Sequence, residues 1–315
     1  QCLYAKIVCK HSYGKQKGAY MIQLKSEELE ASIDPFGAQL TSIRGTKDNI
    51  EYLWKKDPEI WNSSAPIVFP IIGMLNNMEY KLDGKRYSMK SNGLIRYELL
   101  QVLYTSENKA ILQFTSNQET YRQYPFHCHV VLSFTLNKDT LRVHTDIYND
   151  DDKDMLFNYG GHPGFRIPLQ NNESSDDYYV EFEKPENAWI YEVCESGQLT
   201  RKQRQFFHDE RRFFLRRELF MKEALAFQDV CSEAVAIRNL HNKKAVVLRF
   251  SDFDGLGVWS PCKNHPLHFV CLEPWMGHAD FIDFNGDLKD RPGMKKLTAH
   301  DMFSCEYEIQ IQQDM

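Results

Sequence analysis

Residues 130–147, VVLSFTLNKDTLRVHTDI, alternate between apolar and other side chains with a period of two on either side of a short polar turn. The recurring positions are Val130, Leu132, Phe134 and Leu136 before the turn, and Leu141, Val143, Thr145 and Ile147 after it. This alternation is typical of strands that bury one face, and the Asn-Lys-Asp turn predicts that the two strands form an antiparallel hairpin. The segment therefore indicates a β protein.

Period two continues through most of the chain. Asp83-Gly84 separates two short alternating runs and is a strong hairpin signal. A helical period is weak everywhere except at about 211–225, and neither strand–helix alternation nor an internal repeat is found, which argues against an α/β fold. Further strands are predicted from Met21 onward and at 110–114, 178–182, 245–250, 257–260, 269–272 and 303–312.

The chain has 315 residues and no long linker rich in Pro, Gly or Ser. Large all-β domains reach this size undivided. We therefore predict an all-β fold in which residues 21–315 form a single large antiparallel β domain. Residues 1–20 precede the first convincing strand and are interpreted as an N-terminal extension, native or a gene-model artefact, that is not part of the fold.

Composition argues against several classes of protein. The net charge of −6 arises from 38 basic and 44 acidic residues and gives no electrostatic footprint for nucleic acid. The basic stretch 201–217 is mixed with acids and aromatics and is interpreted as a solvated, helical face. No run reaches the ~18 apolar residues of a membrane helix, and the N-terminus lacks the apolar core of a secretory signal. Eight scattered cysteines without a CxxC spacing are typical of reduced thiols, so we predict a cytoplasmic location.

Two short segments carry candidate acid–base groups. Residues 160–165, GGHPGF, place His162 in a glycine-rich turn where glycine permits positive φ and proline stiffens the exit. Residues 271–275, CLEPW, place Glu273 at the end of an apolar strand, where burial would raise its pKa towards that of a useful base. Facing one another across a cleft, the two would supply an acid and a base at neutral pH. The plainer alternatives are a loop histidine bonded to the backbone and a buried structural glutamate.

Other polar and aromatic residues allow weaker interpretations. Trp259 and Trp275 offer flat faces for the C–H side of a sugar ring, or are simply core tryptophans. His127 and His129 lie two apart on a predicted strand, a spacing found in some metal sites, but no third ligand stands at an obvious spacing. Residues 149–154, NDDDKD, resemble a calcium loop in composition but lack its glycine and closing glutamate, so we interpret them as a hairpin tip. No metal site is predicted.

From Met21 to Gln312 the chain resembles the aldose 1-epimerase (galactose mutarotase) superfamily, and within it the LacX-like bacterial branch. The resemblance implies a β-supersandwich of many antiparallel strands and no metal or organic cofactor. It rests on segments that are weak singly but follow the family's order, namely 37–43 (GAQLTSI), 52–54 (YLW), 57–58 (DP) with Trp61, 66–73 (PIVFPIIG), 92–96 (NGLIR), 124–126 (YPF), 160–165 (GGHPGF), 256–261 (LGVWSP) and 273–275 (EPW) with Gly277 and Asp280.

The resemblance also implies catalytic roles. In the family, the glutamate that matches Glu273 removes the proton of the anomeric hydroxyl, and the histidine that matches His162 protonates the ring oxygen. The C1–O5 bond then opens, C1–C2 rotates, and the ring closes on the other face. The chain is thus expected to be a mutarotase acting on a free aldose or a close derivative, with His162 and Glu273 as its acid and base.

Two positions depart from the family pattern. Met74 stands where relatives commonly carry an arginine, and Asn92 stands where they carry a second histidine; both family residues contact sugar oxygens. We predict that Met74, Asn92, Arg96, Trp259 and Trp275 bind the substrate. The departures keep an alternative open, a sugar-binding protein of the same fold without turnover or with altered specificity. In both cases the expected partner is a small sugar, with no nucleic acid or membrane, and the chain is a monomer or homodimer.

Overall fold

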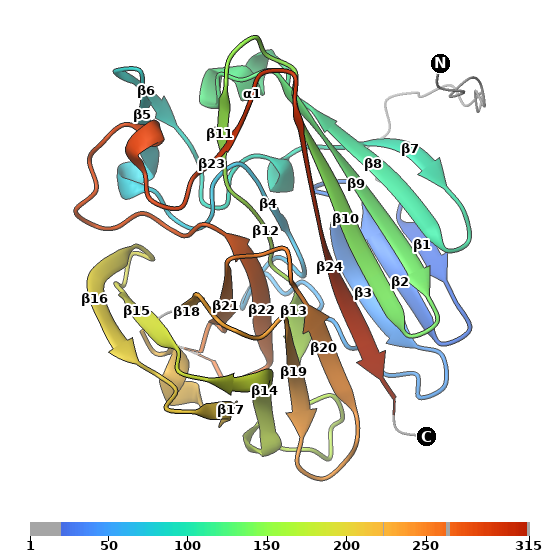
Figure 1. Cartoon of the computed structure of the whole chain (residues 1–315). Coiled ribbons are helices and arrows are strands. Elements are labelled where there is room, and N and C mark those ends of the chain that lie inside the picture. Colours follow the sequence, from blue (N-terminus) through green and yellow to red (C-terminus); the bar gives the residue numbers. More distant parts are fainter. Residues whose placement is uncertain (1–19, 223, 263–264, 314–315) are drawn as a thin grey trace.

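The computed structural model describes residues 20–222, 224–262 and 265–313, and nearly all of its regular structure is β (Figure 1). The first strand is β1 (Ile22–Lys25), close to the predicted start of the fold. The interpretation of residues 1–20 concerns a segment that lies, apart from Tyr20, outside the described residues, so it stays a prediction. In the described part of the chain, no helix combines the length and apolar character needed to cross a membrane.

The largest unit is an antiparallel sheet of nine strands. Its predicted central hairpin is confirmed: Leu136 is paired with Leu141, and the turn residue Lys138 has a φ of 49°. Every second side chain along the first strand of this hairpin is buried, as the period predicts. In spatial order the strands are β17 (Glu210–Phe214), β14 (Tyr178–Glu186), β19 (Ala234–Asn239), β20 (Ala245–Arg249), β24 (Met302–Gln312), β10 (Thr140–Asn149), β9 (Cys128–Asn137), β8 (Lys109–Thr115) and β7 (Gln101–Thr105).

A second antiparallel sheet has eight strands. In Figure 1 most strands of this sheet lie to the lower left of the long strands β8, β9 and β10. In spatial order they are β16 (Leu199–Gln205), β15 (Trp189–Val193), β18 (Leu225–Gln228), β21 (Gly255–Trp259), β22 (Phe269–Met276), β12 (Tyr159–Gly161) and β4 (Ile67–Val68), with β13 (Gly164–Arg166) also paired to β22.

Smaller elements complete the fold. The hairpin predicted at Asp83-Gly84 is present, and both turn residues have positive φ. The small sheets are β1 with β2 (Leu29–Asp34) and β3 (Gln39–Gly45), β5 (Glu79–Leu82) with β6 (Lys85–Ser88), and β11 (Met155–Phe157) with β23 (Lys295–Leu297). The helical elements are α1 (Gln118–Gln123) and short 3-10 helices at Asn76–Met78, Ile95–Tyr97, Ser175–Asp177, Arg217–Phe220 and Leu288–Asp290.

One large hydrophobic cluster draws on both large sheets. It includes Phe134 of β9 and Leu248 of β20 from the nine-stranded sheet, and Phe227 of β18 and Leu272 of β22 from the eight-stranded sheet. Two sheets that bury apolar faces in a common core form a sandwich. The predicted all-β supersandwich is therefore confirmed.

The prediction of helical structure around 211–225 is wrong. The segment begins in strand β17 and ends where β18 starts at Leu225, and its only regular helical structure among the described residues is the short 3-10 helix Arg217–Phe220. Phe213 is paired with Val180 of β14, and Arg211 forms an ion pair of 3.0 Å with Glu181. Sheet pairing and the packing of Phe213 outweigh a weak helical period.

Residues 149–154 are not a hairpin tip. They connect β10 of the nine-stranded sheet to β11, which pairs with β23 in a different sheet. Asn149 holds the connection, since its Nδ2 donates to the carbonyl oxygens of Lys153 at 2.8 Å, Leu297 at 3.1 Å and Thr298 at 3.0 Å. The polar run therefore turns the chain from one sheet to another.

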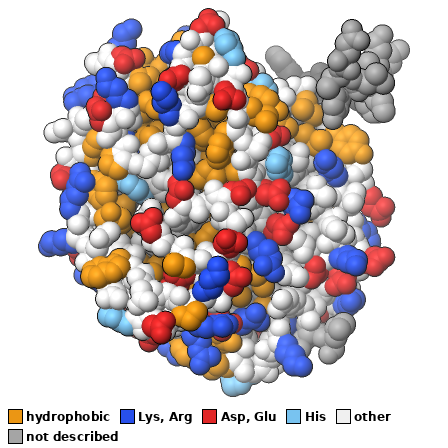
Figure 2. All heavy atoms as spheres, viewed as in Figure 1, with side chains coloured by type: hydrophobic (Ala, Val, Ile, Leu, Met, Phe, Trp, Pro, Cys, Tyr) orange, Lys and Arg blue, Asp and Glu red, His pale blue; other side chains and the backbone are white. Residues whose placement is uncertain are grey.

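Charged side chains of both signs are interspersed on the face drawn in Figure 2. Many form ion pairs, such as Arg142 with Glu308 at 2.8 Å and Lys25 with Glu30 at 2.9 Å. The six cysteines in the described part of the chain are free thiols. These features agree with the small net charge and the scattered cysteines of the sequence.

Candidate active site

Glu273 lies in the middle of β22, whereas the sequence had predicted that it ends a strand. The strand is buried along its whole length, between β21 on one side and β12 with β13 on the other. Cys271, Glu273 and Trp275 alternate along it and therefore project from the same face. Glu273 is paired with Gly257 of β21, where a Cβ atom would lie 2.2 Å from the Trp275 ring. The glycine thus makes room for the indole beside the carboxylate.

The glycines before His162 permit close packing and do not form the predicted turn. Gly160 and Gly161 belong to β12, between β22 and β4, and neither has a positive φ. A Cβ atom on Gly160 would lie 2.6 Å from the carbonyl oxygen of Pro274, and one on Gly161 would lie 2.9 Å from the Tyr307 ring. Glycine is required here because neighbouring segments approach so closely. His162 follows this strand directly.

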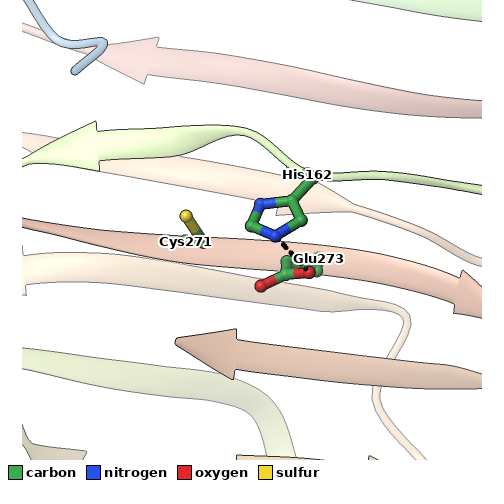
Figure 3. Close-up of side chains that lie close together, drawn as sticks. All are labelled: His162, Cys271 and Glu273. Atoms are coloured by element: carbon green, nitrogen blue, oxygen red, sulfur yellow. Dashed lines mark ion pairs between the residues drawn. The ribbon is translucent and has the colours of Figure 1, made fainter. Parts of the chain in front are cut away.

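The imidazole of His162 and the carboxyl group of Glu273 are in direct contact (Figure 3). Atom Nε2 lies 3.1 Å from Oε2, and the two side chains are 11% and 4% exposed. In Figure 3 the side chains come from neighbouring segments and point towards one another. The two groups therefore share one buried position, whereas the sequence had suggested that they face each other across a cleft.

Burial controls the charge of this pair. It lowers the pKa of His162 and raises the pKa of Glu273, because desolvation penalises both charged forms. Hydrogen bonding from the Trp275 side chain and the positive charge of Arg96 oppose the rise at Glu273, and Arg96 lowers the pKa of His162 further. At neutral pH the pair then holds one proton between the carboxyl group and Nε2. One proton on two adjacent groups is what a coupled acid and base require.

Two tryptophans hold the imidazole of His162. The Trp61 ring stacks on it with a centroid distance of 5.1 Å, and the Trp259 ring meets it edge-on at 5.7 Å. The two indoles are themselves 5.6 Å apart. Such contacts fix the orientation of the imidazole and present apolar faces to a ligand. Trp61 belongs to the family's order of segments but was not predicted as a site residue, because its role depends on a tertiary contact with His162.

The pair lies in a cleft of about 370 Å³, within the range typical of small-molecule sites. The structure brings all seven predicted site residues to this cleft: His162, Glu273, Met74, Asn92, Arg96, Trp259 and Trp275. Its other lining residues, which the sequence did not identify, are Trp61, Ile72, Gly73, Ser91, Val193, Glu195, Ser196, Gly197, Leu199, Ala224, Ala226 and Ala279.

The two departures from the family pattern meet at one turn. Asn92 has a φ of 62°, and its Oδ1 accepts a hydrogen bond from the Gly73 N–H at 2.7 Å. This bond commits the amide oxygen to the turn that carries Met74 and leaves the amide NH₂ group for a ligand. The carbonyl oxygen of Met74 accepts from the Asp280 N–H at 3.0 Å. Asn92 therefore has a structural role in the turn as well as a position in the cleft.

Arg96 is the one Lys or Arg among the described residues that line the cleft. Its Nη2 donates to Oγ of Ser63 at 3.1 Å. Burial lowers the pKa of Arg96, and the negative charge of Glu273 opposes that change. A guanidinium starts from so high a pKa that it stays charged in proteins. Arg96 thus places a fixed positive charge near the catalytic pair.

His162, Cys271 and Glu273 form the one group of three potential metal ligands among the described residues, with donor atoms within 4.8 Å of one another. A metal-binding imidazole normally donates its second N–H to a carboxylate, carbonyl or water. However, the Nδ1 atom of His162 is buried and has no hydrogen-bond partner among the described residues. Burial also holds the pKa of Cys271 well above its usual range, so the thiol stays protonated. We assign no metal here, and a metal-free site stays a prediction.

His127 and His129, the other candidate metal ligands, make separate contacts. His127 precedes β9 and stacks on Tyr121 at 4.6 Å. His129 stacks on Tyr148 at 4.2 Å and pairs with Asp150 at 2.8 Å. In the part of the chain that the structure describes, neither histidine belongs to a group of three close ligand atoms.

A buried ion pair supports the turn that carries Met74. Arg291 contacts Asp280 through Nε and Oδ1 at 2.7 Å, and their side chains are 1% and 3% exposed. The second carboxylate oxygen of Asp280 accepts from the Asn76 N–H at 2.9 Å. Arg291 also donates to Oδ1 of Asn158 at 2.6 Å. With both charges fully paired, this network fixes the wall of the cleft.

The fold and its neighbours among solved structures place this chain in the class of galactose mutarotase-like β-sandwich proteins. A galactose mutarotase related enzyme from Lactobacillus acidophilus is 27% identical, with a TM-score of 0.88 over 94% of this chain and 98% of that chain. A galactose mutarotase-like protein from Lactobacillus casei is 26% identical, with a TM-score of 0.87 over 93% of this chain and 100% of that chain.

The sequence comparison is more specific. A family model described as aldose 1-epimerase matches residues 20–288. The chromosomal LacX protein of Lactococcus lactis subsp. lactis is 32% identical over 298 residues, which cover 92% of this chain and 99% of that protein. The chain belongs to the aldose 1-epimerase family, in its LacX-like branch. The family and branch inferred from the order of short segments are confirmed.

Proposed function

We propose that this protein is an aldose 1-epimerase, a mutarotase that interconverts the α and β anomers of a free aldose or a close derivative. The observation that carries the proposal is the contact of 3.1 Å between His162 and Glu273, buried in a cleft with tryptophan walls. The family assignment supports the same reaction class. The direct acid–base pair is the part of the site that a binding protein would not need.

Glu273 is the base of the proposed reaction and His162 the acid. The Glu273 carboxylate takes the proton of the anomeric hydroxyl while His162 Nε2 gives its proton to the ring oxygen, and the C1–O5 bond breaks. The open aldehyde then rotates about C1–C2. Closure on the other face returns both protons, so the enzyme ends in its starting state.

The sugar must part the two groups before reaction. Without a ligand the pair shares one proton over 3.1 Å, which leaves no room for a hydroxyl between the atoms. When the anomeric hydroxyl hydrogen-bonds to Glu273, the proton of the pair moves to His162. The pair then has the carboxylate and imidazolium that the first step uses, with no exchange of protons with water. The nearby Arg96 charge favours the carboxylate form.

A second candidate function is a sugar-binding protein without turnover, or with altered specificity. Met74 and Asn92 favour it, because Met74 brings no charge into the cleft and the Asn92 amide oxygen is committed to Gly73. Neither residue can transfer a proton at neutral pH. However, neither lies between His162 and Glu273, so the mutarotase proposal does not depend on them.

Polarimetry on freshly dissolved anomers tests the proposed function, and calorimetry on the same sugars measures binding. The mutarotase proposal expects exchange above the buffer rate for at least one aldose, undiminished by a chelator such as EDTA. Binding of an aldose without any acceleration of exchange would replace it with the second candidate. We also propose a cytoplasmic location and a monomeric or homodimeric state, which cell fractionation and sedimentation would test.

A further inference from the structure

The cleft has two unlike ends. One end contains His162, Glu273 and Arg96, which offer hydrogen bonds and charge. The other end, on the side of strands β15, β16 and β18, has an apolar lining formed by Val193, Leu199 and Ala226, and Met74 lies close to Gly197 at its edge. Leu199 and Ala226 belong to a hydrophobic cluster separate from the main core, and Val193 packs against that cluster. Polar side chains at this end, Glu195 and Ser196, are exposed and therefore belong to its rim.

Strand register relates the two ends of the cleft. Ala226 of β18 is paired with Gly257 of β21, and Gly257 is paired with Glu273 of β22. Paired residues share a face of the sheet, and each strand adds roughly 4.8 Å, so Ala226 is about 10 Å from Glu273 along the sheet. The Trp275 ring covers Gly257 between them. Ala226, Gly257 and the Trp275 ring therefore form a continuous apolar surface that extends from Glu273 towards β18.

A bound sugar can extend along this row but not along the strands towards Phe269, the first residue of β22. The stacked Trp61 ring and the edge of Trp259 pack against the imidazole of His162. Phe269 packs behind them, 5.2 Å from Trp61 and 6.1 Å from Trp259. With its anomeric carbon at the catalytic pair, a pyranose therefore lies over Trp275 and directs its far carbon atoms towards Ala226.

The charge distribution and apolar lining restrict what that far end can be. Arg96 is the one cation among the described lining residues and lies at the catalytic end, while the far rim carries the carboxylate of Glu195. A phosphate group there would meet negative charge without a cation. A hydroxyl group against Ala226 and Leu199 would lose hydrogen bonds to water, whereas a methyl group would bury apolar surface.

Resting on the proposed mutarotase function, we propose that the preferred substrates are uncharged 6-deoxyaldoses, whose terminal methyl group occupies the apolar end of the cleft. The terminal methyl group needs no polar partner, so it is compatible with Met74 at the position where relatives commonly carry an arginine. A preference for 6-deoxyaldoses thus explains both the apolar lining and the missing arginine.

Saturation-transfer NMR on matched sugars tests this inference. The pairs are D-fucose with D-galactose and 6-deoxy-D-glucose with D-glucose, and D-glucose 6-phosphate is the charged comparison. The expected kcat/KM is about tenfold higher for the deoxy sugar of at least one pair, a size typical of a single small group in an apolar pocket. The phosphate ester is expected to be the poorest substrate.

A hydroxyl added to the apolar end should reverse this preference. Val193→Thr is nearly isosteric at a half-buried strand position of the cleft, and the matched control is Val131→Thr, half-buried on β9 of the other sheet. The cleft variant is expected to lower the deoxy-to-hydroxy ratio of kcat/KM at least threefold, and the control is expected to leave it unchanged. Thermal unfolding checks that both variants fold.

The outcomes separate this inference from the proposed function. If hexoses and deoxy sugars are exchanged equally well, or hexoses better, the mutarotase proposal stands and the deoxy preference is wrong. The preference is also wrong if Val193→Thr and Val131→Thr have the same deoxy-to-hydroxy ratio of kcat/KM. If no aldose is exchanged, the proposed function itself falls.

Discussion

Atom Nε2 of His162 lies 3.1 Å from Oε2 of Glu273, and both side chains are almost completely buried. In water at neutral pH the carboxyl group would be ionised, but here desolvation favours the neutral form of both groups. The result is a pair that stores one proton until a sugar hydroxyl separates its members. The following predictions test the consequences of this arrangement.

Replacement of His162 by asparagine should reduce anomer exchange by roughly 10²–10⁴-fold, the range typical of a positioned acid or base. Asparagine can donate a hydrogen bond but cannot give a proton to the ring oxygen. Polarimetry on the purified variant measures the loss. The matched control is the double variant His127→Ala/His129→Ala, whose histidines contact Tyr121 and Tyr148 and are not among the described residues that line the cleft; it should exchange anomers like the wild type. Loss of activity together with bound metal in this control would favour a metal enzyme.

The pH profile of exchange should decline on the alkaline side. Burial raises the pKa of Glu273 to about 8. Below that pH the pair keeps its one proton and stays active; as the pH rises through it, the proton is lost and no acid remains. We therefore expect kcat/KM to be flat near neutrality and to fall at higher pH, by about tenfold per pH unit. The buffer-catalysed rate must be subtracted at each pH. A profile that keeps rising above pH 8 would contradict the one-proton pair.

Restoration of both family residues should improve exchange of common hexoses. The pair Met74→Arg with Asn92→His returns polar contacts to sugar oxygens, and we expect kcat/KM for glucose or galactose to rise about tenfold, equivalent to about 1.4 kcal/mol. The two changes belong together, because an arginine alone against the apolar lining would lack a partner. Asn92→His alone serves as a control for the lost hydrogen bond to Gly73. A decrease in a folded double variant would show that the cleft is adapted to another substrate.

The buried Asp280–Arg291 pair should be essential to stability. Asp280→Asn leaves the guanidinium of Arg291 uncompensated in a fully buried position, and breaking such a pair costs about 3–5 kcal/mol of the free energy of unfolding. Urea denaturation measures this loss. Asp283→Asn is the matched control, because Asp283 pairs with Arg201 at 3.1 Å with both side chains 57% exposed. That variant should lose about 1 kcal/mol or less. Equal effects of the two substitutions would contradict the role given to the buried pair.

The sequence predicted what depends on local pattern. The alternation at 130–147 located β9 and β10 because half-buried strands impose a period of two. Segments 160–165 and 271–275 predicted His162 and Glu273 as neighbours. The sequence did not predict the exact positions of these residues. Glu273 lies in mid-strand, and position 160 requires glycine because the carbonyl oxygen of Pro274 packs against it.

What the sequence could not show depends on contacts between distant segments. Trp61 acts through its stacking on His162, and Leu199 and Ala226 reach the cleft through strand pairing. Trp61 stood out in the sequence only as part of the family's order of segments, and Leu199 and Ala226 have no local signal. The weak helical period near 211–225 was misleading because pairing with β14 decides its structure.

The most direct test of the account is the rate of anomer exchange in wild-type protein and in Glu273→Gln, measured by saturation-transfer NMR on an equilibrated aldose. The amide keeps the shape of the carboxyl group but cannot accept the proton of the anomeric hydroxyl. We predict that the wild type accelerates exchange and that the folded variant loses about 10²–10⁴-fold of that acceleration. Exchange at the wild-type rate in a well-folded Glu273→Gln protein would contradict the role of Glu273 as the base and, with it, the proposed mechanism.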